Sequence, residues 1–193
     1  SFRCGPMALR CILKSDQRLL ASSPTNAMRE IFNSASTQRG FSLPQVAERI
    51  LADHFIPGGK SPGTPFRLTA MPTLQSRPTL VELTVVSNFV EVFLAKEGHA
   101  GPVGINYLEK IQLPTLPSIF GAMLAGVDYV LMGAGIPRAI PGVLDLLARG
   151  ETAQLPIDVE GSLPGEKHLY TLSPRSFFDG TPPQLKRPQF LGI

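Results

Sequence analysis

Short apolar runs alternate with helical patterns through the middle of this chain. The pattern predicts two strands and two helices, in the order 103–107 (strand), 117–125 (helix), 127–132 (strand) and 140–149 (helix). Strands that alternate with helices of this length are typical of a parallel sheet with right-handed crossovers. Because the strands are apolar at consecutive rather than alternate positions, we expect protein to cover both faces of the sheet. The sequence therefore predicts an α/β fold.

The region before these elements is less regular. A helix is predicted over 43–55, and a proline- and glycine-rich connection over 56–78 follows it. Residues 83–86 are β-branched and apolar and predict a further buried strand. A helix is predicted next over 89–96, with Gly98 as the residue that ends it.

Residues 151–188 are polar and rich in proline, and we interpret them as an insertion before the next sheet strand, which begins near Phe190. Within the insertion, 157–159 and 169–172 are candidate short strands.

The two ends of the chain differ from its middle. Residues 1–42 have no clean period and are predicted to form a divergent N-terminal segment, separate from a sheet domain over 43–193. The chain begins with Ser1 and stops in what reads as a strand just starting at 189–193. A buried parallel strand is an unusual place for a domain to finish. We therefore expect this polypeptide to be a piece of a longer domain.

Composition narrows the function classes. Of 193 residues, 43% are hydrophobic and 17% charged, as in globular proteins rather than disordered tails. The net charge of +3 is spread along the chain, without the basic clusters interleaved with aromatics that bind nucleic acid. The apolar stretches read as too short or too interrupted to span a bilayer, so no membrane association is predicted.

The cysteines and histidines predict neither a disulfide framework nor a metal site. Cys4 and Cys11, with six residues between them, match neither zinc spacing nor a redox CxxC pair, which favours a reducing, cytoplasmic location. His54, His99 and His168 lie far apart in the sequence. His99, which follows Gly98 after a helix, is either a polar helix-exit residue or a weak catalytic candidate.

The turn Gly133-Ala134-Gly135 lies between a strand and a helix, where a dinucleotide fingerprint belongs. The third glycine of that fingerprint would stand at Arg138, and the acidic residues about twenty positions on, Glu151 and Asp158, fall in a loop and a doubtful strand. A tight turn is the favoured interpretation, and a NAD-binding module is a distant alternative.

Asn106 is a candidate binding residue. An asparagine inside an apolar strand is costly unless its amide is hydrogen-bonded. Either a neighbouring backbone group satisfies that amide, or the amide is left for a polar ligand ring.

Two stretches carry a family resemblance. The first runs from Asn88-Phe89-Val90 through Gly104-Ile105-Asn106-Tyr107-Leu108-Glu109-Lys110, and the second covers 121–141 with its Leu-Ala-Gly-Val-Asp-Tyr-Val-Leu-Met-Gly-Ala-Gly-Ile-Pro core. Both resemble the larger bacterial members of the 2-nitropropane dioxygenase (nitronate monooxygenase) family. That family includes the flavin enoyl reductases of polyunsaturated fatty acid and polyketide synthases. The resemblance extends from about residue 43 to 161, and more loosely to 193.

The resemblance implies a (β/α)₈ (TIM) barrel, of which this chain would be the N-terminal portion, with FMN at the carboxyl ends of the strands. It implies Asn106 beside the flavin, on the same strand as Gly104, and Gly133 and Gly135 at the border of the pocket. The family's catalytic histidine and phosphate-binding glycines would lie beyond this chain. We therefore expect the polypeptide alone to bind FMN poorly and to turn over no substrate.

The function implied is an FMN-dependent oxidoreductase that oxidises alkyl nitronates, which are small molecules, with oxygen. An FMN-dependent enoyl reductase of a fatty acid or polyketide synthase is the first alternative. A truncated, catalytically inactive barrel fragment is the second. The residues by themselves do not separate the three.

Overall fold

The computed structural model describes residues 44–54, 61, 63–65, 69–178 and 180–193. The chain divides into two compact units, Ser1–Met71 and Pro72–Ile193. In the first unit, α4 (Pro44–His54) confirms the helix predicted over 43–55, and its Val46 and Ile50 are buried one helical turn apart. The predicted N-terminal segment 1–42 lies outside the described residues.

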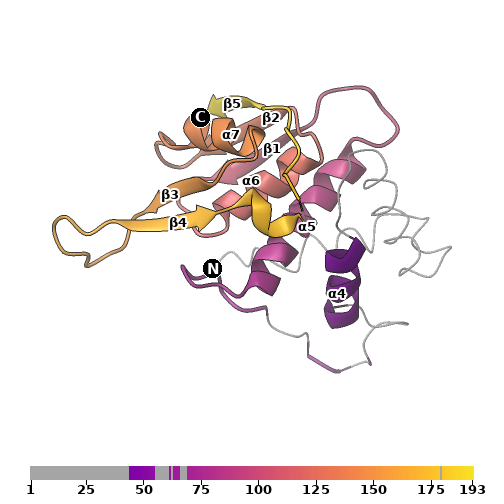
Figure 1. Cartoon of the computed structure of the whole chain (residues 1–193), viewed down its shortest axis with the longest axis horizontal. Helices are drawn as coiled ribbons and strands as arrows, with labels where there is room; N and C mark the ends of the chain where they lie inside the picture. Colours follow the sequence, from indigo (N-terminus) through magenta and orange to yellow (C-terminus); the bar gives the residue numbers. More distant parts are fainter. Residues whose placement is uncertain (1–43, 55–60, 62, 66–68, 179) are drawn as a thin grey trace. The chain divides into compact units, whose positions relative to one another are not determined.

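The second unit is built around a parallel sheet of three strands in the order β1-β2-β5 (Figure 1). The strands are β1 (Gly104–Leu108), β2 (Tyr129–Gly133) and β5 (Gln189–Gly192). All three were expected at these places, and both pairings are parallel. The described residues therefore form a mixed α/β fold with a parallel sheet, as the alternation of strands and helices predicts.

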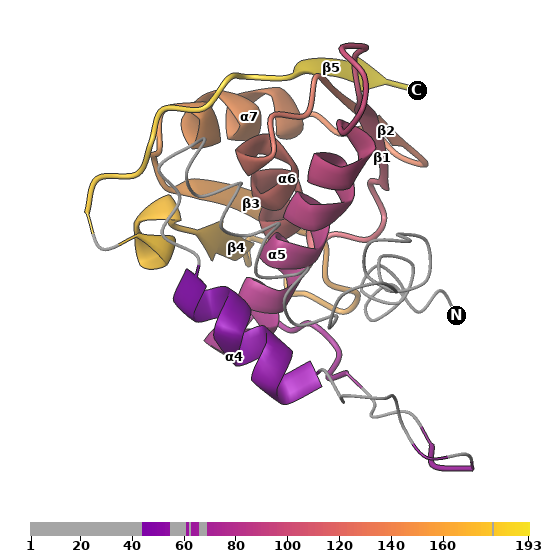
Figure 2. The same cartoon turned by 90° about the vertical axis from the view of Figure 1, so that its right-hand side faces the viewer.

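Three helices of this unit lie on one side of the sheet (Figure 2). They are α5 (Pro78–Ala95), α6 (Thr115–Leu124) and α7 (Ile140–Ala148). α6 is buried along its whole length because it lies between the strands and the other helices. Its Phe120 and the buried Val130 and Met132 of β2 belong to one apolar core.

The strand predicted over 83–86 is wrong, because these residues form the first half of α5. Pro78 begins that helix at a position where its missing N–H loses no hydrogen bond. The buried residues Val85, Val86, Phe89 and Val90 recur at helical spacing. Burial against α6 therefore outweighs the β preference of the branched residues.

α5 also corrects the expectation that no apolar stretch is long enough for a bilayer. Among helices of the described residues, it has the length and the apolar composition to cross a membrane. Core helices share these properties, and five of its apolar residues are packed inside the protein: Val85, Val86, Phe89, Val90 and Val92.

Gly121 sets the distance between α5 and α6. A Cβ atom at this position would overlap the backbone carbonyl of Val85, lying 2.9 Å from its carbon atom. The two helices can therefore approach this closely only because residue 121 has no side chain.

Glycines follow the ends of three helices, and Gly98 confirms the prediction made for it from the sequence. Gly98, Gly126 and Gly150 have φ angles of 76°, 74° and 71° and follow α5, α6 and α7. This left-handed conformation closes helices at little cost when the residue is glycine.

The insertion over 151–188 forms a separate two-stranded sheet in which β3 (Ala153–Ile157) pairs antiparallel with β4 (His168–Leu172) (Figure 1). The strand predicted at 169–172 is confirmed. The one predicted at 157–159 is displaced, because it lies mostly earlier in the chain and Val159 is exposed. A 3₁₀ turn, η1 (Pro174–Phe177), follows.

Within the part of the chain that the structure describes, helices cover one face of the three-stranded sheet. Ile105, Val130 and Phe190 stand opposite one another in the register. Their face is the covered one, because Val130 is buried and Tyr107, two residues after Ile105, hydrogen-bonds to Ser118 of α6. The neighbouring positions, which point the other way, are exposed at Asn106 and Leu191. Among the described residues, the expected cover is therefore present on one face, although the strands are apolar at consecutive positions.

Candidate functional site

The three parallel strands end together, and this shared edge is the first candidate site. The N–H of Glu109 donates to the carbonyl of Gly133 over 2.9 Å, which extends the pairing of β1 and β2 by one residue. On the other side, the N–H of Ile193 donates to the carbonyl of Met132 over 3.0 Å. In parallel α/β proteins, ligands bind at this carboxyl edge.

Asn106 lies in the middle of β1 on the exposed face of the sheet, opposite Leu131 of β2. Its side-chain amide has no hydrogen-bond partner in the part of the chain that the structure describes. Of the two interpretations of this residue, the structure does not support satisfaction by a neighbouring backbone group. The amide is available for a ligand, with one acceptor oxygen and two donor hydrogens.

Gly104 and Gly133 lie on the same exposed face as Asn106, at opposite ends of their strands. A Cβ on Gly104 would come 3.2 Å from Leu131 Cδ1, and one on Gly133 would meet Ile193 at 3.7 Å. The space above Gly104 is therefore occupied by Leu131, and Gly133 lies in ordinary contact distance of Ile193.

The turn from β2 to α7 contains the other predicted glycine, Gly135. A side chain there would collide with Glu109, whose Cβ would lie 2.9 Å away and whose carboxylate oxygen closer still. Ala134, beside it, has a φ of 62°, a left-handed conformation that strains a residue with a side chain. Strain of this kind is common where a turn is shaped for a ligand.

Glu109 is a residue that the sequence reasoning missed. It directly follows the strand that carries Asn106, and a polar residue at the carboxyl end of a parallel strand is a position where sites form. That signal is present in the sequence, but nothing in it shows that Glu109 packs against Gly135.

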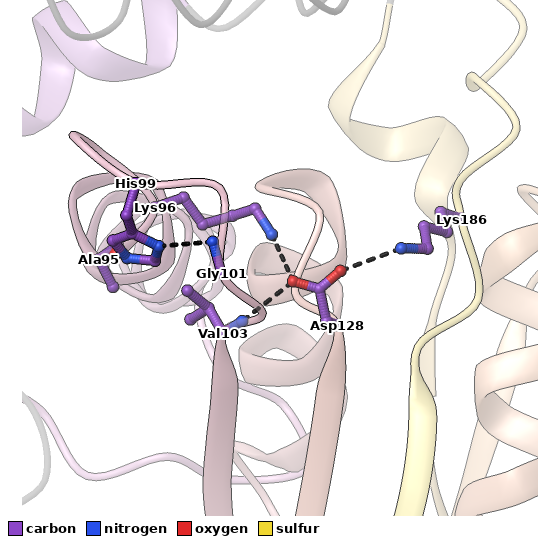
Figure 3. Close-up of polar contacts among 7 residues, drawn as sticks. All are labelled: Ala95, Lys96, His99, Gly101, Val103, Asp128 and Lys186. Atoms are coloured by element: carbon purple, nitrogen blue, oxygen red, sulfur yellow. Dashed lines mark hydrogen bonds and ion pairs between the residues drawn. The ribbon is translucent and has the colours of Figure 1, made fainter.

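His99 lies at the other end of the sheet, before β1 begins (Figure 3). Its Nε2 is 2.7 Å from the carbonyl oxygen of Ala95, and its Nδ1 accepts a hydrogen bond from the Gly101 N–H at 3.0 Å. The ring thereby closes the end of α5, as the helix-exit interpretation requires. The structure does not bring His99 together with Gly133 and Gly135.

Asp128 is the centre of a polar cluster at this same amino end (Figure 3). Its carboxylate accepts Lys96 Nζ at 2.5 Å, Lys186 Nζ at 3.0 Å and the Val103 N–H at 3.0 Å. These hydrogen bonds, that from Lys96 foremost, hold the pKa of the Asp128 carboxyl well below its usual range. Asp128 and Lys96 thereby tie α5, β1, β2 and the approach to β5 together.

Tyr107 is the polar residue on the covered face of β1. Its hydroxyl is 3.1 Å from Asn88 Oδ1 and 3.0 Å from the carbonyl oxygen of Ser118. Burial raises the pKa of the Tyr107 phenol far above its usual range. The phenol therefore stays neutral and joins α5 to α6 rather than transferring protons.

The structure does not favour the NAD-binding alternative, because neither of its two acidic candidates is placed to bind a ribose. Glu151 is held by the Arg149 guanidinium at 2.9 Å, and Asp158 is hydrogen-bonded to Gln112. β3, which precedes Asp158, belongs to the separate antiparallel sheet rather than standing beside β2. A ribose-binding carboxylate would have to end the neighbouring parallel strand.

Within the described ranges, no three His, Cys, Asp or Glu residues gather as metal ligands. Compared with models of known protein families, with curated proteins and with solved structures, the chain matches none of the three. The resemblance to the nitronate monooxygenase family therefore rests on the residues of the chain itself.

Proposed function

We propose that this chain is part of an FMN-dependent oxidoreductase of the nitronate monooxygenase type, built on a (β/α)₈ barrel. The observation that carries the proposal is the free amide of Asn106 on an open sheet face. It coincides with the strand that, by resemblance, lies beside the flavin. On this exposed face, water satisfies the amide when no ligand is bound, and a ligand would replace that water.

The strand order supports a barrel. Each later parallel strand is added on the same side of the one before, in the order β1-β2-β5, and α5, α6 and α7 lie on one face. A doubly wound sheet instead reverses its strand order and places helices on both faces. A barrel keeps helices outside and strands inside, so the exposed face with Asn106 corresponds to the barrel interior.

The residues present fit a flat ring that is partly apolar and partly hydrogen-bonding. Leu131 stands opposite Asn106 in the register, and its side chain lies over Gly104, so it supplies an apolar surface beside the amide. Such a combination of an apolar wall with a single convergent polar group is typical of cofactor sites.

In this proposal the flavin, when bound, supplies the electron transfer, and the chain supplies binding and orientation. The Asn106 amide, as donor and acceptor, fixes the orientation of the ring by hydrogen bonding. The helix layer keeps the opposite face of the sheet dry.

An enoyl reductase of a fatty acid or polyketide synthase is the second candidate. Its substrate is an uncharged thioester, whereas a nitronate is an anion. The carboxylate of Glu109 at the carboxyl edge favours an uncharged ligand there, and this observation supports the second candidate.

A catalytically inactive fragment is the third candidate. Three parallel strands do not close a barrel, and apolar side chains stand exposed on the open face, with 47% of Leu191 and 39% of Leu108 accessible to solvent.

The experiment is a visible spectrum after desalting, recorded on the 193-residue chain and on the longest reading frame that contains it. Flavin bands in the longer protein would support an FMN barrel of which this chain supplies a part. Flavin bound tightly to the 193-residue chain would overturn the expectation that the chain alone binds FMN poorly. Flavin in neither would contradict the oxidoreductase proposal and favour the inactive fragment.

A further inference from the structure

We propose that the outer edge of β4 is a self-association surface, at which a second copy of this chain adds its own β4 antiparallel to the first. The inference goes beyond the proposed flavin function, because β3 and β4 form a sheet separate from the strand that carries Asn106.

The hairpin of β3 and β4 has one buried face and one exposed face. β3 contacts α7 and β4 contacts α6, and the side chains on this face are buried: Ala153, Leu155, Tyr170 and Leu172. On the other face, 45% of Leu169 is accessible to solvent, and Thr171 is exposed. The loop of the hairpin extends beyond the helices (Figure 1). The helices therefore anchor the hairpin by one face.

Pro156 determines which backbone groups of the hairpin point outward. Opposing residues of an antiparallel pair alternate between exchanging hydrogen bonds and directing their N–H and C=O groups away from each other. Pro156 has no N–H and stands opposite Leu169 in a continuous register. The pairing remains complete when Pro156 and Leu169 are of the second kind. The backbone groups of Leu169 and Thr171 therefore point to the outer edge of β4.

The two outer edges of the hairpin differ. The edge of β3 presents Gln154 and Pro156, and a proline on an edge hinders the addition of a strand. The edge of β4 presents a complete donor and acceptor at both Leu169 and Thr171. Within the described ranges β4 pairs with β3 alone, and no other group hydrogen-bonds to this edge. β4 is therefore the edge that can accept a further strand.

The edge of β4 is complementary to itself. An antiparallel pair that is symmetric about Tyr170 places Leu169 of each copy opposite Thr171 of the other. Both residues direct N–H and C=O outward, so each of the two pairs exchanges two hydrogen bonds, about four in all. A two-fold axis pairs this edge with itself and needs no other surface.

The charges near this edge favour a second copy over a charged peptide. β4 contains no Asp, Glu, Lys or Arg, so two antiparallel copies place no like charges opposite each other. His168, at its start, is 3.1 Å from Ser162 Oγ within its own hairpin. An acidic or basic peptide would find no opposite charge on the strand, whereas a second β4 is as uncharged as the first.

Sedimentation velocity of the 193-residue chain, over about 1 µM to 1 mM, measures the equilibrium between monomer and dimer. We expect a dimer whose formation slows hydrogen exchange at the amides of Leu169 and Thr171 as the concentration rises. The amide of Gln154, on the outer edge of β3, should exchange at a rate that does not depend on concentration.

Thr171→Pro removes an outward N–H and no hydrogen bond to β3. We expect it to weaken the dimer about ten- to hundredfold, because each copy loses one donor. Gln154→Pro is the matched control, since Gln154 stands opposite Thr171 and its N–H points to the outer edge of β3. Both substitutions also remove the 3.4 Å hydrogen bond between these two side chains. The control should leave the dimer unchanged.

Leu169→Lys keeps every backbone donor and therefore tests the same edge without a proline. It places a charge near the two-fold axis in each copy and should weaken the dimer about tenfold. Leu163→Lys is its control, because Leu163 is exposed in the loop between β3 and β4. It should leave the dimer unchanged. Urea unfolding of each variant verifies that it is folded.

A chain that remains monomeric up to about 1 mM would overturn the inference. So would a dimer that the two control variants weaken as much as Thr171→Pro and Leu169→Lys do. A dimer in which the Leu169 and Thr171 amides exchange as fast as in the monomer would place the interface elsewhere. Slow exchange of both amides in a monomer would show that the chain covers this edge itself, which also contradicts the inference.

Discussion

The two ends of the parallel sheet carry similar groups in opposite states. At the amino end, the carboxylate of Asp128 is held by two lysines and a backbone N–H. At the carboxyl end, the carboxylate of Glu109 lies against Gly135 with no ion pair among the described residues. The first arrangement joins four elements of the fold, whereas the second leaves charge available at a strained turn.

The difference separates stability from binding. In parallel α/β proteins, polar groups at the amino ends of strands hold the fold, and those at the carboxyl ends serve ligands. Substitutions at Asp128 should therefore change the free energy of unfolding, and substitutions at Glu109 or Asn106 should change ligand binding. A loss of ligand binding without a loss of stability in an Asp128 variant, or the reverse in an Asn106 variant, would contradict this comparison.

The largest effect is expected in the helix layer that supports both ends. Gly121→Ala places a methyl group against the Val85 carbonyl and should destabilise the protein by about 2 kcal/mol, because backbone must shift. Gly142→Ala in α7 is the control, since nothing lies within 4 Å of its Cβ position. It should be neutral or stabilising by up to about 1 kcal/mol. Urea unfolding measures both, and equal effects would contradict the packing described here.

Asp128→Asn should destabilise by about 2 kcal/mol, because it removes the charge that Lys96 and Lys186 share. Asp145→Asn removes the carboxylate from a more exposed pair with Arg187 and should lower stability by less than about 1 kcal/mol. Urea midpoints distinguish the two. If Asp128→Asn lowers the free energy of unfolding no more than Asp145→Asn does, the cluster at the amino end of the sheet does not stabilise the fold as described.

The stability contributed by Asp128 should depend on pH. The pKa of its carboxyl is lowered in the folded protein, so the unfolded chain binds the proton more readily. Its contribution is complete above about pH 4, the ordinary value for an aspartate, and is lost as the pH falls through the lower folded value. The unfolding free energy of Asp128→Asn should therefore fall less steeply in acid. Parallel curves for the two proteins would contradict this assignment.

At the carboxyl end, Gly135→Ala should cost about 1 kcal/mol, since mainly the Glu109 side chain has to move. Urea unfolding measures the loss. A stability loss as large as that of Gly121→Ala would show that the turn is rigid.

The smallest effect on stability is expected for Asn106→Ala, within about 0.5 kcal/mol, because the amide is exposed. Flavin affinity should nonetheless fall about tenfold with the loss of its hydrogen bonds. Asn88→Ala is the matched control: it removes a partner of the buried Tyr107 hydroxyl and should cost about 1 kcal/mol without altering flavin affinity. If Asn88→Ala lowers flavin affinity and Asn106→Ala does not, Asn106 does not bind the flavin.

Much of the sheet domain could be predicted from local pattern. The strands that became β1, β2 and β5 are apolar runs of the right length, and Gly98, Gly126 and Gly150 mark helix ends by their conformational freedom. The strand prediction over 83–86 was wrong because β-branched residues favour strands locally. Their helical spacing stabilises a helix only through packing on α6, which the local sequence does not show.

The candidate site likewise contains some residues that a local pattern indicates and others that only long-range contacts identify. Asn106 stood out because a polar residue interrupts an apolar run, and the Gly133–Gly135 turn because of its place between a strand and a helix. Glu109 was missed because its significance lies in a contact with a residue 26 positions later in the chain. The pairing of Asp128 with Lys186, 58 positions away, was missed for the same reason.

The sequence by itself determined the α/β class, the parallel strands and the helix ends, because these depend on neighbouring residues and on periodicity. Only the tertiary structure decided which face of the sheet is open, which carboxylate is neutralised and which is left unpaired. Those properties depend on groups far apart in the sequence, and a local pattern contains no information about the distance between them.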